Sequence, residues 1–333
     1  MHEWLYGEEG YYSHKRTIGK EGDFYTAVST SMFFGGSIAK KLINTIESGF
    51  LSPSCHVVEI GAHKGYLLAD MIQFLFSLKP SLLESLTFVI VEPFLENQAM
   101  QKEYFQEAFG DAISFLHVKS VEELKCKEAF IVANEIFDAF CCEIIKDEQI
   151  LHVENHQPMF KQLPAAMRDQ VQKMDISKGE VCFEYAPFAK ALSRSFERYE
   201  FVTFDYGDKD AREDFSLRVY DHHQTYPFFT LTDLVEESLQ SPKTLKELFG
   251  KSDITYDVNF THLINAFAQT GARVEGYATQ MRALVEFGLI ELLEMLQKNV
   301  SYEAYLSEMN KVKILLDPSF MGERFKMLCL RFG

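Results

Sequence analysis

The sequence predicts an α/β fold in which helices cover both faces of a mostly parallel sheet. Between residue 54 and about residue 207, short runs rich in β-branched and aromatic residues alternate with longer stretches of helical periodicity. Most of the short runs are apolar throughout, as expected for strands buried on both faces. The predicted strands are 55–60, 86–92, 112–118, 129–134 and 200–207. This alternation is typical of a doubly wound fold.

The segments between and after these strands complete the predicted organisation. Leu68, Ile72 and Leu75 recur at helical spacing after Gly65 and predict a helix behind the first strand. The stretch that follows residue 135 is too long for a simple crossover, so we expect an insertion there, with a hairpin in "CCEIIKDEQILHVEN" and a helix in "APFAKALSRSFERY". The predicted organisation is an N-terminal arm and lid (1–53), a sheet domain (54–207) with an insertion around 140–195, a mostly helical accessory region (208–320) and a final core strand (321–333).

Composition narrows the functional classes. The chain has 333 residues, of which 47% are hydrophobic, and its longest apolar runs are too short to cross a membrane. The N-terminus resembles neither a signal peptide nor a transit sequence, and the six cysteines show no paired spacing, so we expect a cytoplasmic protein. The formal charge of −16 argues against a nucleic-acid partner and suits either a basic protein substrate or simple solubility.

A glycine turn follows the first predicted strand, in "HVVEIGAHKGYLLADMI". Gly61 allows a sharp turn, and Gly65 allows the backbone to approach a ligand closely at the start of a helix. The dinucleotide fingerprint requires further glycines where this chain has His63 and Tyr66. A nicotinamide-dependent oxidoreductase is therefore disfavoured.

Acidic residues cluster around this turn. Glu59 precedes it, Glu92 ends the second strand, and Glu135 and Asp138 follow the fourth. Carboxylates suit a cationic, phosphate-free nucleoside better than a pyrophosphate, and an acid at the end of the second strand suits a ribose diol. The pattern favours S-adenosylmethionine as the cofactor. No residue pattern indicates a metal site.

Nine ordered blocks of the sequence resemble the MidA-type family, which includes the mitochondrial complex I assembly-factor protein-arginine methyltransferase and its bacterial relatives. Among them are "GYYSHKRTIGKEGDFYTAVSTSMFFGGSIA", "VVEIGAHKGYLLADM", "IVEPFLENQ", "VANEIFDAF", "SDITYDVNF" and "FMGERFKMLCLRF", and together they cover nearly the whole chain. The resemblance implies a class I, Rossmann-like methyltransferase fold that uses S-adenosylmethionine. It also implies a protein substrate, such as a respiratory-complex subunit methylated on arginine, and leaves a homodimer open.

The family motifs assign the candidate site residues. Those expected to bind the cofactor are Glu59, Gly61, Ala62, Gly65, Glu92, Asn134, Gly22 and Thr26. Those expected to act in catalysis are Asn134, Glu135, Asp138 and Asp23, with "EGDFYTA" as a lid. A carboxylate can hold a guanidinium and accept its proton, and the Asn134 carbonyl can orient the attacking nitrogen. Asp138 could equally cap the following helix.

His63 is the main departure from the family pattern, because it replaces the middle glycine of the loop. It could crowd the methionine end of the cofactor or simply face solvent. This leaves a second hypothesis open, in which the chain is a methyltransferase-fold binding module that assists assembly of a respiratory complex with little catalysis.

Overall fold

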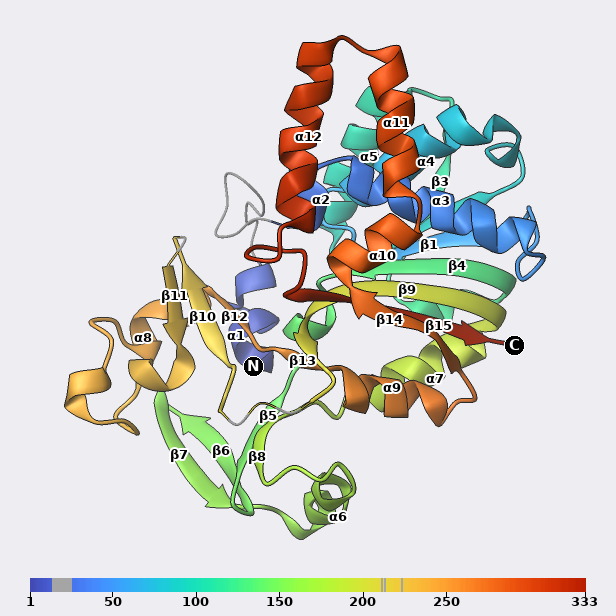
Figure 1. The fold of residues 1–333 in the computed structure, drawn as a ribbon. Coiled ribbons are helices and arrows are strands. Elements are labelled where there is room, and N and C mark those ends of the chain that lie inside the picture. The colour runs from blue at the N-terminus through green and yellow to red at the C-terminus, as the bar shows by residue number, and fades with distance from the viewer. Residues whose placement is uncertain (14–25, 211, 213, 223) are drawn as a thin grey trace. The chain divides into compact units, whose positions relative to one another are not determined.

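The computed structural model describes residues 1–333 except 14–25, 211, 213 and 223 (Figure 1). The chain forms two compact units, each assembled from separate segments. The core unit comprises Tyr25–Ile136, Phe188–Tyr206 and Phe267–Gly333, and the insertion unit comprises Met1–Phe24, Phe137–Pro187 and Gly207–Ala266. The core unit thus takes in residues that the sequence pattern assigned to an arm and to an accessory region.

The core unit is built on a sheet with the strand order β14-β15-β9-β4-β1-β2-β3 (Figure 1). Its strands are β1 (His56–Ile60), β2 (Thr87–Val91), β3 (Phe115–Val118), β4 (Cys126–Asn134), β9 (Phe196–Asp208), β14 (Arg273–Thr279) and β15 (Phe325–Phe332). Strands β3, β2, β1, β4 and β9 run parallel, whereas β15 is antiparallel to both of its neighbours. The five parallel strands and the final strand confirm the sequence prediction.

Strand β14 was not predicted. Its first three residues, including Arg273 and Glu275, are exposed, and it forms the edge of the sheet beside β15. An edge strand can carry charged side chains because one of its sides is not covered by another strand. Such a strand lacks the apolar run by which the buried strands were recognised.

Helices pack against the core sheet and share one hydrophobic cluster with it. The helices of this cluster are α2 (Ala27–Thr30), α3 (Phe33–Glu47), α4 (Tyr66–Leu78), α5 (Leu95–Phe109), α10 (Gln280–Glu286), α11 (Leu289–Asn299) and α12 (Tyr302–Leu316). A further helix, α7 (Tyr185–Ser195), starts in the insertion unit. Helices α3 and α4 pack together, and Phe34 of α3 contacts Phe204 of β9 with 4.9 Å between ring centres. Helices α11 and α12 form a hairpin (Figure 1).

The insertion unit contains two small antiparallel sheets. The first joins β5 (Glu143–Lys146), β6 (Gln149–Glu154), β7 (Gln157–Gln162) and β8 (Lys178–Val181) in the order β7-β6-β5-β8, and the second joins β10 (Arg218–Asp221), β11 (Gln224–Pro227) and β12 (Asp253–Thr255). Short helices α1 (His2–Leu5), α6 (Ala165–Lys173) and α8 (Leu245–Leu248) belong to this unit, as do β13 (Val258–Asn259) and most of α9 (Phe260–Ala268). The predicted hairpin is confirmed as β5–β6, whereas the strands after residue 208 were not expected in a mostly helical region.

None of the helices in the described ranges is both long enough and apolar enough to cross a membrane.

A buried carboxylate ties helix α3 to the core sheet. The side chain of Glu200 on β9 is fully buried, and it accepts hydrogen bonds from Thr45 Oγ1 at 2.6 Å and Arg331 Nε at 2.6 Å. Lys41 Nζ lies 3.0 Å from the same carboxylate. A charge held inside a protein must be compensated, and here two cations and a hydroxyl compensate it.

We expect Glu200→Gln to lower the free energy of unfolding by about 3 kcal/mol, because it leaves two cations without their shared buried partner. Chemical denaturation followed by circular dichroism measures the change. The matched control is Glu286→Gln, which breaks the exposed ion pair with Arg282 on α10 and should cost less than about 0.5 kcal/mol. Equal effects of the two substitutions would contradict a structural role for Glu200.

Candidate active site

The ends of three parallel strands form one edge of the core sheet. Ile60 of β1 is in register with Val91 of β2 on one side and with Ala133 of β4 on the other. The residues that follow them, Gly61, Glu92 and Asn134, therefore lie at the same level of the sheet. We call this the site edge. Ligands of open α/β sheets bind beyond such carboxyl ends.

The glycine turn at the site edge has the backbone geometry that the sequence predicted. Gly61 and Gly65 have φ angles of +73° and +81°, and the Gly65 N–H donates to the Ala62 carbonyl at 2.7 Å. A Cβ at Gly61 would lie 2.8 Å from Cγ2 of Ile136, and one at Gly65 would lie 2.9 Å from Cε2 of Phe105. Both positions therefore require glycine for space as well as for conformation.

His63 occupies the turn with a φ of +47°, a conformation that glycine adopts more easily. Its carbonyl accepts a hydrogen bond of 2.7 Å from the side-chain amide of Gln101 on α5. The chain thus forms the turn without the family's middle glycine, with a neighbouring helix holding the backbone of His63.

Glu59 supports the turn from within the core unit. It is only 3% exposed, and its Oε2 accepts a hydrogen bond of 3.1 Å from the backbone N–H of Leu68, in the first turn of α4. The pKa of Glu59 is raised to about 8, mainly by burial; the Leu68 bond opposes this shift and neighbouring Asp70 adds to it. The predicted cofactor ligand therefore also fixes the start of α4.

Glu92 is 3% exposed at the end of β2. Its Oε1 accepts a hydrogen bond of 3.0 Å from the Phe94 N–H, and its Oε2 lies 3.4 Å from Nε2 of Gln101. Burial raises the pKa of this carboxyl above its ordinary value, although the hydrogen bonds oppose that shift. The carboxylate is fixed in orientation at the position expected for a ribose ligand.

Asn134 and Glu135 form a polar pair at the end of β4. The Asn134 amide donates to Oε1 of Glu135 at 2.8 Å, and the Glu135 N–H donates to the Phe204 carbonyl at 2.8 Å. Glu135 has a φ of +53°, which is uncommon for a residue with a side chain and recurs at functional sites. Oδ1 of Asn134 is buried and has no hydrogen-bond partner among the described residues, so this acceptor is suited to a ligand that donates.

The remaining predicted site residues are Thr26, Ala62, Asp138, Gly22 and Asp23. Thr26 caps α2, where its Oγ1 accepts a hydrogen bond of 3.2 Å from the Ser29 N–H. Ala62 is buried in the glycine turn. Asp138 belongs to the insertion unit, where it is 6% exposed in a short 3₁₀ turn. Gly22 and Asp23 of the predicted lid lie outside the described residues.

Two polar residues beside the site edge were not predicted from the sequence. Gln101 contacts both His63 and Glu92 from the polar helix α5, and burial raises the pKa of Asp70 on α4 to about 7. Neither residue directly follows a strand, and both lie on helices, so only the packing of the helices shows that they are near the site edge.

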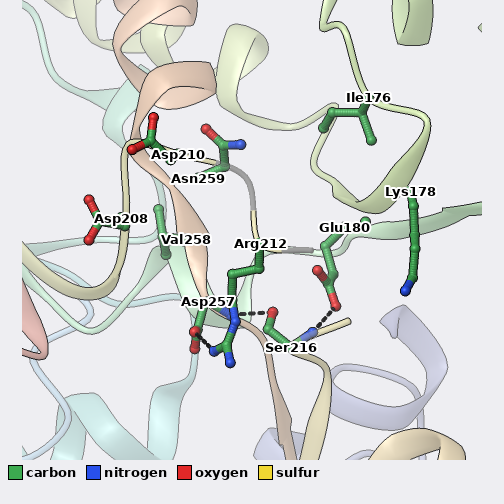
Figure 2. A pocket seen from close by; sticks show the side chains of 11 residues that line it. Ile176, Lys178, Glu180, Asp208, Asp210, Arg212, Ser216, Asp257, Val258 and Asn259 are labelled. Carbon is green, nitrogen blue, oxygen red and sulfur yellow. Dashed lines mark hydrogen bonds and ion pairs between the residues drawn. The ribbon is translucent and has the colours of Figure 1, made fainter. Parts of the chain in front are cut away.

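Several charged side chains surround a small hollow in the insertion unit (Figure 2). Around it, Asp257 is paired with both Arg212 and Arg218, while Glu180 accepts hydrogen bonds from the Ser216 and Leu217 N–H groups at 2.7 and 2.8 Å. Asn259 also lines this hollow. The paired charges explain the local fold and do not themselves indicate a ligand.

Comparison with known proteins identifies the family. Residues 37–278 match the model of a family described as S-adenosyl-L-methionine-dependent methyltransferases. The chain belongs to this family. It is therefore a methyltransferase with S-adenosylmethionine as its cofactor, and the resemblance drawn from the sequence blocks is confirmed.

This methyltransferase is similar to curated relatives named "Protein arginine methyltransferase NDUFAF7, mitochondrial". The protein from Rattus norvegicus is 24% identical over 97% of this chain and 77% of its own length. The protein from Homo sapiens is 21% identical, with 97% and 76% covered. The similarity thus extends through both compact units.

A solved structure confirms the fold. A COG1565 superfamily member from Burkholderia thailandensis, crystallised with S-adenosyl-homocysteine, superimposes with a TM-score of 0.80 at 22% identity. The comparison covers 99% of this chain and 86% of that one. This methyltransferase therefore has a class I, Rossmann-like fold.

The site edge fits the family's cofactor. The buried acceptor of Asn134 needs a donor, and the Glu92 carboxylate can accept hydrogen bonds from ribose hydroxyls. The glycine turn allows the backbone to approach the cofactor closely. Glu92, Gly61, Gly65 and Asn134 are thus the residues that would hold it.

We expect Glu92→Ala to weaken S-adenosylhomocysteine binding at least 100-fold, because two charge-assisted hydrogen bonds to the ribose are lost. Isothermal titration calorimetry gives the dissociation constant, and thermal unfolding shows whether the variant is folded. Glu96→Gln removes an exposed negative charge at the start of α5 and should leave binding unchanged. Undiminished binding by folded Glu92→Ala would refute the ribose assignment.

The pH dependence of stability tests the burial of Glu59. Its pKa is about 8 in the folded chain and near 4.5 when unfolded, so the folded state retains a proton that the unfolded state releases between these values. Stability should therefore fall as pH rises from 5 to 8, by up to about 1.4 kcal/mol per pH unit for one proton. In Glu59→Gln the fall of stability with pH should be shallower. Part of it should persist, because burial also raises the pKa of Asp70. Denaturation at several pH values measures it, and an unchanged slope would be inconsistent with burial of an ionisable Glu59.

Proposed function

We propose that this methyltransferase adds a methyl group to an arginine nitrogen of a partner protein. The observation that carries the proposal is the Asn134–Glu135 pair at the site edge, where a carboxylate lies beside a buried carbonyl acceptor. The names of the curated relatives support the same substrate class. A guanidinium combines positive charge with several N–H donors and is therefore complementary to this pair.

The pair has the groups that arginine methylation requires. S-adenosylmethionine supplies a methyl group carried on a positively charged sulfur. An amide oxygen has two lone pairs, so Oδ1 of Asn134 can accept one guanidinium N–H in addition to a donor of the cofactor, and it thereby orients the attacking nitrogen. The Glu135 carboxylate balances the guanidinium charge and receives the proton that the nitrogen loses as it gains a carbon. The catalytic roles expected for Asp138 and Asp23 from the sequence remain predictions.

The proposed partner is a respiratory-complex subunit, as the family resemblance of the sequence blocks implies. The chain has 49 acidic and 33 basic residues and a formal charge of −16, and this negative charge is compatible with a basic partner. The cysteine pattern supports a reducing compartment such as the cytoplasm.

We expect Glu135→Gln to lower the rate of methyl transfer by about 10²- to 10⁴-fold, the usual contribution of a general base, with cofactor affinity nearly unchanged. The assay follows tritium from labelled S-adenosylmethionine into proteins of a lysate from a deletion strain, followed by hydrolysis and identification of the labelled amino acid. Glu122→Gln is the matched control, because Glu122 is an exposed acid of the same unit.

Label in methylarginine that depends on Glu135 would support the proposal. Label on another amino acid would refute the arginine assignment. An absence of label despite intact cofactor binding and partner capture would favour the assembly-module hypothesis.

A further inference from the structure

Gln101 lies at the centre of a buried hydrogen-bond network beside the site edge. It is fully buried on α5, and its Nε2 lies 2.7 Å from the His63 carbonyl oxygen and 3.4 Å from Oε2 of Glu92. Its Oε1 lies 2.7 Å from Nε2 of His117 on β3. The side chain of Gln101 thus contacts the glycine turn, the predicted ribose ligand Glu92 and the neighbouring strand β3.

The partners determine which way the Gln101 amide points. The His63 carbonyl accepts only, and so does the Glu92 carboxylate when it is ionised, so the amide nitrogen must face them. The amide oxygen then faces His117, whose Nε2 must carry the hydrogen. Burial lowers the pKa of His117 to about 4, with a further contribution from Lys102, so the ring is neutral near pH 7 and keeps this arrangement. The reversed amide would place its oxygen against two acceptors.

Gln101 also accounts for His63 in the turn. A residue with a side chain is less stable than glycine at positive φ. The 2.7 Å bond from Gln101 to the His63 carbonyl holds this peptide in place. The same amide nitrogen also faces Oε2 of Glu92, whose Oε1 accepts from the Phe94 N–H. Gln101 therefore links the geometry of the turn to that of the carboxylate.

We propose that Gln101 is the positioning residue for ribose recognition in this methyltransferase, because it fixes the Glu92 carboxylate and the glycine turn in one mutual geometry. Gln101 acts on cofactor binding through its contacts with Glu92 and the turn, and we give it no contact with the reacting atoms. The proposal concerns cofactor binding alone and is independent of the protein substrate.

The experiment measures how strongly each variant distinguishes a ribose from a deoxyribose. Calorimetry gives dissociation constants for S-adenosylhomocysteine and for its 2′-deoxy counterpart. In the unsubstituted protein the deoxy compound should bind at least tenfold more weakly, because a hydrogen bond to a charged group is lost. We call the dissociation constant of the 2′-deoxy compound divided by that of S-adenosylhomocysteine the ribose ratio. In Gln101→Met, whose side chain has a similar shape and no amide, the ribose ratio should fall to about 2 or less.

Gln98→Met is the matched control. Gln98 lies on the same helix and donates to Glu92 as well, at 2.7 Å, but to its main-chain carbonyl. The ribose ratio should therefore stay at the value of the unsubstituted protein. A ratio that Gln98→Met reduces as much as Gln101→Met does would overturn the proposal, because any loss of packing on α5 would then suffice.

Two further variants complete the test. Gln101→Asn keeps the amide but shortens the side chain, so it should also lower the ribose ratio. It provides the test if Gln101→Met does not fold.

His63→Gly combined with Gln101→Met should recover part of the affinity for S-adenosylhomocysteine, because glycine adopts the positive φ without strain. It should not recover the ribose ratio. Full retention of the ratio in folded Gln101→Met or Gln101→Asn, or no ribose preference in the unsubstituted protein, would overturn the proposal.

Discussion

The parallel register of β1, β2 and β4 is the constraint on which the site depends. Because Ile60 pairs with Val91 and with Ala133, the next residue of each strand reaches the same edge of the sheet. A shift of one strand by a single residue would turn its side chains to the opposite face. The glycine turn, the ribose acid and the Asn134–Glu135 pair are therefore brought together by backbone pairing, although they are far apart in the sequence.

The site edge combines acidic groups with burial, and this combination favours a positively charged ligand. Glu59 and Glu92 are both buried, and burial raises the pKa of each. An ionised carboxylate in such surroundings is costly unless a charge or a hydrogen-bond donor compensates it. S-adenosylmethionine carries two positive charges and a ribose diol, so its binding can supply this compensation, whereas a pyrophosphate would add to the cost.

The sequence was sufficient for features that depend on local pattern and chain order. The apolar strands, the hairpin β5–β6, the glycine turn and the strand-end position of Glu92 all follow from such patterns. The polar edge strand β14 has no apolar run, and Gln101 becomes significant only because α5 packs over the glycine turn. Long-range packing of polar side chains leaves no periodic signal, so these features required the structure.

His63 shows how a departure from a family motif can be accommodated. A glycine at this position would provide a positive φ at little cost, whereas His63 adopts φ +47° with a side chain attached. The cost is offset by contacts that surround the peptide, among them the bond from Gln101 to its carbonyl. The loop therefore keeps its shape because a side chain of the neighbouring helix α5 stabilises it, without the conformational freedom that a glycine would give. A residue that breaks the motif is thus informative about where the supporting contacts lie.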